Sequence, residues 1–359
     1  MIHSVWVKSF RCLSENLISF DASSFLSVVS ENNVGKTSLL EACYILGNLQ
    51  SFVTKSLSDI VPFNQKSSYM GIKLAHHDSS TSYYLKVDSE GKKFITLNNH
   101  PVRNKKAIQS LFRVHYISSD SLFFITSSPA FRRARLDHSI SQYSATYRSN
   151  LAAYKRLNLQ KNKTLKFDGD RSLLGHLNQL LAPLIVAIQD ERTCYLSRIE
   201  SDMNVFLASL SMPVNQVNIR YYSKLQEPKS VSDVLLYLND QMARERLIRS
   251  ATVGPHRDDY EFFCKDRSLK LFYSRGMGRI IAYFFQLSQA RIIKNITELP
   301  MLLLLDEPFS EIHRDLKCVL INGIPELFYS IYVSTQPDEV TALNQTPLYA
   351  IKNGKLCKH

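Results

Sequence analysis

A loop near the N-terminus contains residue types that bind phosphate. A β-rich apolar run, Phe25–Val29, leads into it, and apolar residues at helical spacing follow it. In a phosphate-binding loop of pattern G-x-x-x-x-G-K-[ST], backbone N–H groups hold phosphate oxygens, the lysine contacts the β- and γ-phosphates, and the hydroxyl binds Mg²⁺. Gly35, Lys36 and Thr37 fit this pattern, whereas Ser30 stands where the first glycine belongs. The candidate loop comprises Ser30, Glu31, Asn32, Asn33, Val34, Gly35, Lys36, Thr37 and Ser38.

The missing glycine leaves the assignment of this loop open. A Gly-Lys-Thr sequence in an ordinary loop is the alternative interpretation. Asparagine tolerates positive φ better than most residues. We therefore expect Asn33 to take the left-handed backbone conformation that a glycine would otherwise supply.

A carboxylate pair near the C-terminus would complete such a site. The apolar run Met301–Leu305 has the composition of a central parallel strand covered on both faces, and it ends at Asp306-Glu307. Doubly wound sheets bind ligands beyond the carboxyl ends of their strands. There Asp306 would support Mg²⁺, and Glu307 would be the general base that polarises an attacking water. Such a pair alone is a weak signal, but with the Gly-Lys-Thr loop and Ser310-Glu311 it indicates ATP hydrolysis.

A glycine-rich segment, Tyr273–Gly278, lies about 30 residues before Asp306 at the start of an expected helix. It is similar to the signature loop of ABC ATPases, S-x-G-Q in the DNA-repair branch. The serine and glycine N–H groups of that loop contact the γ-phosphate held by the opposite subunit. Ser274 and Gly276 match, while Met277 replaces the glutamine. The alternative is a glycine-rich turn before a helix.

The elements that would position these residues form two lobes. Both chain ends alternate strand-like and helical segments, whereas the middle of the chain is mostly helical. We predict an α/β ATPase lobe from residues 1–112 and 292–359, and a mostly helical lobe from residues 113–291. The second lobe would hold the basic stretch and the signature loop. The sequence contains no internal repeat and no heptad array.

Basic residues are in surplus, which suggests a polyanionic partner. The chain has 359 residues, with 44 Lys and Arg against 32 Asp and Glu, a formal net charge of +12. The segment Phe131–Lys166 concentrates the surplus, with nine basic residues and a single acid, Asp137. A solvated helix face is the alternative to a phosphate-facing surface. The candidate DNA contacts are Arg132, Arg133, Arg148, Lys155 and Arg156.

An aromatic stripe runs through the same segment. Tyr143, Tyr147, Leu151 and Tyr154 recur at spacings of four and three, so they would share one face of a helix. We favour core packing over base stacking for this stripe.

Composition also excludes several classes of protein. The longest uninterrupted apolar run, Ile280–Phe285, is far shorter than the ~20 residues of a membrane-spanning helix. The N-terminus shows no secretory signal. Six cysteines are scattered without C-x-x-C pairs, which argues against a disulfide framework or a zinc site and fits a reducing cytosol. We therefore expect a cytoplasmic protein that does not enter the membrane.

The motifs together resemble those of the RecF family, DNA repair proteins of the SMC-like ABC ATPase group. The resemblance covers nearly the whole chain, and the Thr252–Asp259 block, T-V-G-P-H-R-D-D, is its most specific part. The other matching segments are Phe10-Arg11, Glu41-Ala42-Cys43-Tyr44, Ser51-Phe52, Ser128-Pro129, Arg132-Arg133 and Leu136-Asp137.

This resemblance implies a fold, a mechanism and a set of partners. Two subunits would close head-to-tail around two ATP molecules with Mg²⁺. Lys36, Thr37 and Asp306 of one subunit would face Ser274 of the other, and Arg11 would lie near the nucleotide. The protein would be a weak DNA-linked ATPase that clamps DNA at gaps and single-strand/double-strand junctions. RecR with RecO would be its partners, and it would support RecA loading, replication restart and the SOS response.

Several residues depart from the family pattern. Ser30 and Asn33 replace glycines, Met277 replaces glutamine, and Ile312-His313 replaces the Leu-Asp of the D-loop. These departures motivate an alternative: a diverged protein that binds nucleotide and partners structurally with little or no ATP turnover. An ABC transporter cassette is excluded by chain length, by the G-P-H-R-D-D block and by the large helical insert.

Overall fold

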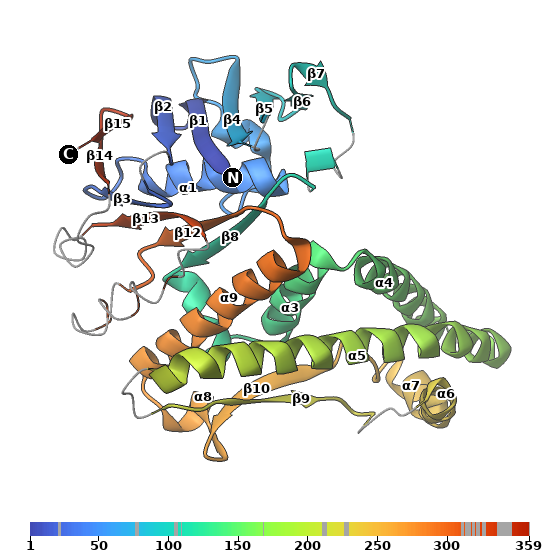
Figure 1. The fold of residues 1–359 in the computed structure, drawn as a ribbon. Coiled ribbons are helices and arrows are strands. Elements are labelled where there is room, and N and C mark those ends of the chain that lie inside the picture. The colour runs from blue at the N-terminus through green and yellow to red at the C-terminus, as the bar shows by residue number, and fades with distance from the viewer. Residues whose placement is uncertain are drawn as a thin grey trace. The chain divides into compact units, whose positions relative to one another are not determined.

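The computed structural model forms two compact units (Figure 1). Unit 1 contains Met1–Leu122 and Thr297–His359, and unit 2 contains Phe123–Ile296. The structure describes residues 1–20, 23–75, 79–103, 107–108, 110–167, 169–209, 214–225, 230–309, 312, 317, 320, 324, 328–335 and 347–358. Ser310, Glu311 and His313 of the sequence analysis, and Cys318, one of the six cysteines, lie outside these residues.

The described part of unit 1 contains two six-stranded sheets. The first is antiparallel, in the order β2-β1-β4-β5-β6-β7. Its strands are β1 (Ile2–Phe10), β2 (Leu13–Ser19), β4 (Ser67–Ala75), β5 (Ser80–Asp88), β6 (Lys93–Leu97) and β7 (His100–Pro101). The second has the order β15-β14-β3-β13-β12-β8. Its strands are β3 (Phe25–Val29), β8 (Arg113–Ser118), β12 (Met301–Asp306), β13 (Tyr329–Ser334), β14 (Leu348–Lys352) and β15 (Lys355–Lys358).

Helix α1 (Lys36–Asn48) lies between these sheets and contacts strands of both. Its apolar side chains, among them Leu39, Leu40 and Leu46, are almost completely buried. This burial confirms the helix expected after the candidate loop. A short 3₁₀ helix, η1 (Leu57–Ile60), follows on the way to β4.

Five neighbouring strands of the second sheet, β14, β3, β13, β12 and β8, are parallel, because each adjacent pair runs in the same direction. All five apolar residues of Met301–Leu305 are fully buried, as a strand covered on both faces requires. The carboxyl ends of β3 and β12 therefore meet at one edge of the sheet. Strand β8 belongs to this sheet, although the predicted boundary at residue 112 would assign it to the helical lobe.

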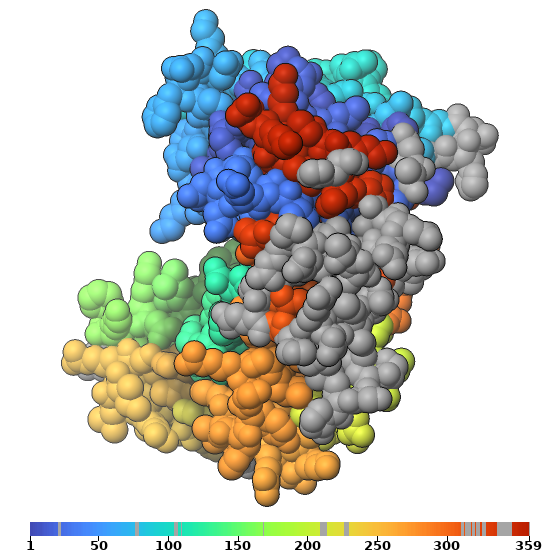
Figure 2. All heavy atoms as spheres, turned by 90° about the vertical axis from the view of Figure 1, so that its left-hand side faces the viewer, coloured from blue at the N-terminus to red at the C-terminus, as the bar shows by residue number. Residues whose placement is uncertain are grey.

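The C-terminal hairpin closes the other side of this sheet. Strands β14 and β15 are antiparallel, and Asn353 and Gly354 in their turn have positive φ angles of 49° and 72°. Gly354 O accepts hydrogen bonds from Ser14 N–H and Asn16 Nδ2. Figure 2 accordingly shows the C-terminal residues (red) at the surface against the N-terminal ones (blue). Asparagine and glycine both tolerate the positive φ that this two-residue turn requires.

Unit 2 is mostly helical. A 3₁₀ helix, η2 (Asp120–Thr126), leads into it. Its described helices are α3 (Pro129–Tyr143), α4 (Ala145–Lys166), α5 (Arg171–Ser209), α6 (Val231–Asp240), α7 (Met242–Ile248), α8 (Leu269–Phe272) and α9 (Arg275–Thr297). A three-stranded sheet joins β9 (Asn218–Tyr222), β10 (Asp259–Cys264) and β11 (Arg267–Ser268), a feature that the sequence pattern did not predict.

The aromatic stripe is divided between two helices. Tyr143 ends α3, and Ser144 begins α4 by accepting a hydrogen bond from Tyr147 N–H with its side chain. The prediction of one continuous helix was therefore wrong, because a serine cap interrupts it. Tyr147, Leu151 and Tyr154 are buried, so the interpretation as core packing is confirmed.

Among the described helices, α5 alone is long and apolar enough, by length and composition, to cross a membrane. It packs against α4, α6 and β9 within unit 2. Its polar residues Gln189 and Arg192 are buried there and hydrogen-bonded. These contacts are those of a core helix of unit 2.

Candidate nucleotide-binding site

The backbone of the loop after β3 has the conformations that a phosphate loop needs. Asn33 has φ 63°, as expected from its residue type, and Gly35 has φ 110°. A Cβ atom on Gly35 would lie 2.7 Å from Cys12 Sγ and 3.0 Å from Leu13 Cδ2. Gly35 is therefore required both by its conformation and by the close approach of the segment after β1.

Ser30 fits the loop although it replaces a glycine. It is not among the described residues with positive φ, so a Cβ causes no backbone strain there. Its hydroxyl accepts a hydrogen bond of 2.6 Å from Ile351 N–H, and its own N–H donates to Ser334 O at 3.2 Å. The serine thus ties the start of the loop to β14 and β13.

Lys36 is held over the loop by oxygen atoms. Its ammonium donates to Ser30 O at 2.7 Å and to Glu31 O at 2.9 Å. Glu307 Oε1 lies 3.6 Å from the same nitrogen. The Lys36 side chain is only 7% exposed, so its ammonium group is held in one place at the loop.

Asp306 and Thr37 lie next to each other, as the predicted Mg²⁺ site requires. The Thr37 hydroxyl donates to Asp306 Oδ2 at 3.2 Å. Burial raises the pKa of Asp306, while hydrogen bonds from Tyr116 and Thr37 act in the opposite direction. Mg²⁺ is bound by few protein oxygens together with phosphate oxygens and water. A hydroxyl and a carboxylate at this separation fit that donor set.

Tyr116 is a site residue that the sequence analysis missed. Its hydroxyl donates to Asp306 Oδ2 at 2.9 Å. It lies on β8 opposite Leu304 of β12, two residues before Asp306, and therefore projects from the same face of the sheet. Burial, and next the charge of Asp306, raise the pKa of the phenol, so it remains a hydrogen-bond donor at neutral pH. No local motif marks this tyrosine, because its role depends on the pairing of β8 with β12.

Aromatic rings fix the position of Tyr116. Phe52 stacks on it with ring centroids 4.0 Å apart and an interplanar angle of 16°. Tyr44 of α1 contacts both rings edge-on. Tyr44 and Phe52 belong to motif segments that matched the RecF family, and the structure brings them together here.

Glu307 has a left-handed backbone conformation, with φ 46°. Its N–H donates to Val333 O at 3.1 Å, which holds the turn after β12 in place. Non-glycine residues in this region of φ are strained, and such strain concentrates at functional sites. The carboxylate is 28% exposed and points to Lys36, so a water molecule can reach it.

Arg11, Glu41 and Ser51 form a second polar cluster in unit 1. The Arg11 guanidinium donates from Nε to Glu41 Oε2 at 2.6 Å and from a terminal nitrogen to Oε1 at 2.9 Å. Ser51 donates to Glu41 Oε1 at 2.5 Å. The Glu41 hydrogen bonds raise the pKa of Arg11. The structure shows that Glu41 of α1 holds the Arg11 side chain in place. The contact of Arg11 with nucleotide stays a prediction.

The signature-like segment begins helix α9 in unit 2. Ser274 is exposed, and its hydroxyl accepts a hydrogen bond of 3.3 Å from Met277 N–H. Gly276 has no heavy atom within 4 Å of the position of a Cβ, so its surface is open. The cap uses only the backbone of residue 277, and the replacement of glutamine by methionine therefore leaves it intact.

The Thr252–Asp259 block is held by buried polar contacts within unit 2. Gly254 has φ 126°, and a Cβ there would lie 2.5 Å from the Tyr154 hydroxyl. Asp258 Oδ2 accepts hydrogen bonds from Gln189 and Tyr221, both at 2.7 Å. The block is thus a structural centre of unit 2.

The candidate DNA contacts divide into buried and exposed residues. Arg132 is 2% exposed and donates two hydrogen bonds to Asp259, at 2.9 and 2.5 Å. This burial contradicts the prediction that Arg132 contacts DNA, because Asp259 already neutralises its charge inside unit 2. Arg133 is half-buried and donates to Asp258 O. The exposed candidates, all on α4, are Arg148, Lys155 and Arg156.

The chain is similar to RecF proteins over nearly its whole length. It is 24% identical over 363 residues to the DNA replication and repair protein RecF of Clostridium botulinum, covering 99% of each chain. It is 26% identical over 345 residues to that of Staphylococcus aureus strain JH9, covering 92% of this chain and 93% of the relative. No family model matches the chain.

Solved structures show the same fold. A structure of the recombination mediator protein RecF with ATPrS matches with a TM-score of 0.83 and 24% identity, covering 100% of this chain and 98% of that one. An SMC head bound to the C-winged helix domain of ScpA matches with a TM-score of 0.59 and 14% identity, covering 100% and 98%. The chain is thus similar in sequence to RecF proteins over nearly its whole length, and it shares the fold of RecF and SMC head structures.

Proposed function

We propose that this protein is an ATP-dependent DNA-binding clamp that acts in DNA replication and repair. The observation that carries the proposal is the grouping of Lys36, Thr37, Asp306 and Glu307 at the carboxyl ends of β3 and β12. This grouping joins a phosphate-binding cation, a metal-binding pair and a carboxylate near bulk water. It is the set of groups that phosphoryl transfer to water requires.

In the proposed mechanism, the loop N–H groups and Lys36 hold the β- and γ-phosphates of ATP. Thr37 and Asp306 would hold Mg²⁺, which would supply positive charge to the phosphates when bound. Glu307 orients a water molecule and accepts its proton. Ser274 and the open backbone at Gly276 would contact the γ-phosphate from a second subunit, so ATP would bind at a dimer interface and hydrolysis would release it.

The wider role follows from similarity to RecF. We propose that the dimer binds double-stranded DNA and single-strand/double-strand junctions in the cytoplasm. RecR with RecO would be its partners, and it would thereby support RecA loading, replication restart and SOS induction. The name of the matched relatives, DNA replication and repair protein, and the RecFOR pathway of the matched structure support this assignment.

The alternative is a protein that binds nucleotide with little or no turnover. Its motivation was the loss of glycine at residues 30 and 33 and of the D-loop pair at Ile312-His313. The geometry of the loop weakens the first motive, because Ser30 causes no backbone strain and Asn33 takes the positive φ expected of it. Retention of Glu307 beside Lys36 also favours catalysis.

Light scattering with and without Mg-ATP tests the clamp. We expect ATP to convert a monomer to a dimer, and Glu307→Gln to hold the dimer by blocking hydrolysis. ATP binding with the same dimeric mass in wild type and variant would favour the alternative. Absence of ATP binding in wild type would contradict the site assignment.

DNA contact is tested by reversing charge on α4. We expect Arg148→Glu, Lys155→Glu and Arg156→Glu together to weaken duplex binding and to reduce the salt dependence of log K by about 2.7, since each phosphate contact contributes about 0.9. ATP affinity should be unchanged. The matched control reverses three exposed lysines of the C-terminal hairpin, Lys352, Lys355 and Lys358. Equal loss in the control would show a net-charge effect and reject α4 as the contact.

A further inference from the structure

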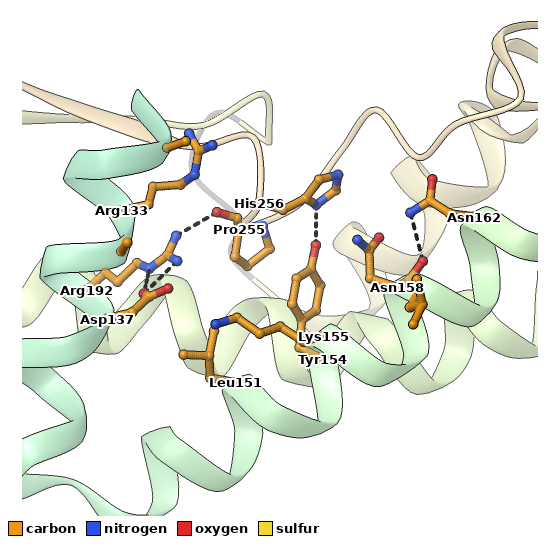
Figure 3. Close-up of a pocket in the computed structure, with 13 residues that line it drawn as sticks. Arg133, Asp137, Leu151, Tyr154, Lys155, Asn158, Asn162, Arg192, Pro255 and His256 are labelled. Carbon is orange, nitrogen blue, oxygen red and sulfur yellow. Dashed lines mark hydrogen bonds and ion pairs between the residues drawn. The ribbon is translucent and has the colours of Figure 1, made fainter. Parts of the chain in front are cut away.

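Unit 2 contains a cavity of about 370 Å³ that is separate from the candidate nucleotide site (Figure 3). Helices α3 and α4 form two of its sides, and the loop at Pro255 and His256 forms a third. Arg192 of α5 also lines it. This volume is within the range of pockets that hold small organic ligands, about 300–1,000 Å³.

The cavity has cationic groups without matching anions. Arg192 is neutralised by Asp137, with contacts of 2.8 and 3.1 Å. Arg133, by contrast, donates a single hydrogen bond, to the backbone oxygen of Asp258. Lys155 is exposed and makes no hydrogen bond or ion pair with any residue that the structure describes. These two cations, neither of which has an ion-pair partner among the described residues, stand on α3 and α4, on facing sides of the cavity.

The charged groups that line the cavity favour an anionic ligand. Burial, and next the charge of Arg192, lower the pKa of Arg133, while the carboxylates of Asp259, Asp258 and Asp137 act in the opposite direction. His256 adds no charge at neutral pH, because burial lowers its pKa to about 4. Its Nε2 donates to Ala251 O, which leaves Nδ1 to accept from the Tyr154 hydroxyl at 2.5 Å. The net charge presented to a ligand is therefore positive.

The remainder of the lining is suited to a base and a sugar. Leu151, Leu159 and Pro255 supply apolar surface. The side-chain amide of Asn158 has no partner among the described residues and offers both a donor and an acceptor. An inorganic anion would use the cations alone, whereas a nucleoside phosphate would use all three kinds of surface.

We propose that this cavity binds a nucleoside monophosphate group, with its phosphate between Arg133 and Lys155 and its base near Asn158 and the apolar wall. The group could be a free nucleotide or the phosphorylated end of a DNA strand. The DNA source rests on the proposed function and is favoured by α4, which has no acidic residue and continues with exposed Arg156, Lys163 and Lys166.

Calorimetry with dTMP tests the site, with Mg-ATP saturating the other site in the Glu307→Gln variant. We expect Lys155→Ala to weaken dTMP binding about tenfold or more, as loss of a charge-assisted contact does. The control, Lys270→Ala, removes an exposed cation of α8 that lies outside the cavity lining and should change dTMP affinity less than about twofold. Arg133→Lys, which keeps the charge, should weaken binding less than Arg133→Ala.

Three results would overturn the proposal: no dTMP binding, equal dTMP affinity in wild type and Lys155→Ala, or inorganic phosphate binding as tightly as dTMP. Oligo(dT) with and without a 5′-phosphate distinguishes the sources. A preference for the 5′-phosphate that Lys155→Ala abolishes identifies a DNA end, and binding of dTMP without that preference identifies a free nucleotide. ATP affinity measured in the same variants separates failure of this site from failure of the proposed ATPase.

Discussion

The hydrogen bond from Tyr116 to Asp306 offers the most specific test of the catalytic geometry. Tyr116→Phe removes the hydroxyl that donates to Asp306 Oδ2 at 2.9 Å. The ring and its 4.0 Å stack on Phe52 remain, so packing is conserved. Among the described residues, Thr37 then remains the side-chain hydrogen-bond donor to this carboxylate. The substitution therefore isolates one hydrogen bond to a buried charge.

The size of the effect follows from the charge of the acceptor. A hydrogen bond to a charged group contributes about 1.5–3 kcal/mol, and about 1.4 kcal/mol corresponds to a factor of ten. Burial already raises the pKa of Asp306, and the hydrogen bond opposes that shift. Its loss raises the pKa further, so the ionised carboxylate that binds Mg²⁺ becomes less favourable. We expect the Mg²⁺ concentration for half-maximal ATP hydrolysis to rise about tenfold or more.

The assay is ATP hydrolysis as a function of Mg²⁺ at several pH values. Because the pKa of Asp306 rises in the variant, the deficit should be largest at low pH and should shrink as pH rises. Tyr84→Phe is the matched control, since Tyr84 is exposed on β5. A Tyr116→Phe variant with the same Mg²⁺ and pH dependence as wild type would refute the role of this hydrogen bond.

Three further predictions concern single residues. Gly35→Ala should abolish ATP binding, seen in an equilibrium binding assay, while circular dichroism stays native, because the new Cβ would lie 2.7 Å from Cys12 Sγ; retained ATP affinity would contradict this. Lys161→Met should lower the free energy of unfolding by about 3–5 kcal/mol in urea, because Lys161 and Glu245 form a buried ion pair at 2.7 Å. Adding Glu245→Met should restore most of that loss; a neutral single variant would disprove the pair's importance. His256 has its pKa lowered from 6.5 to about 4, so its contribution to stability is present above pH 6.5 and is lost as pH falls toward 4, by about 3 kcal/mol. The unfolding free energy of His256→Gln should vary less over that pH range, and an identical pH dependence would argue against the shift.

The residues of the candidate site were predictable where the chemistry lies in contiguous segments. A glycine before Lys-Thr, an asparagine able to take positive φ, and an acidic pair after a buried strand are each local properties. The structure accordingly brings Lys36, Thr37 and Asp306 together. The two-lobed α/β architecture follows from the same local periodicities and from the resemblance to RecF.

Burial and long-range pairing could be known only from the tertiary structure. Arg132 and Lys155 belong to the same basic stretch, yet Arg132 is neutralised by Asp259, whereas Lys155 is exposed and forms no ion pair with the described residues. Tyr116 donates a hydrogen bond to Asp306 only because β8 pairs with β12, and these two strands are far apart in the sequence. The sequence by itself determined which groups can bind phosphate and metal, because those depend on residue type and local conformation. Packing decided which basic side chains remain available to a partner. The residue type gives each of them the same positive charge, and only the fold places an acidic residue beside some of them.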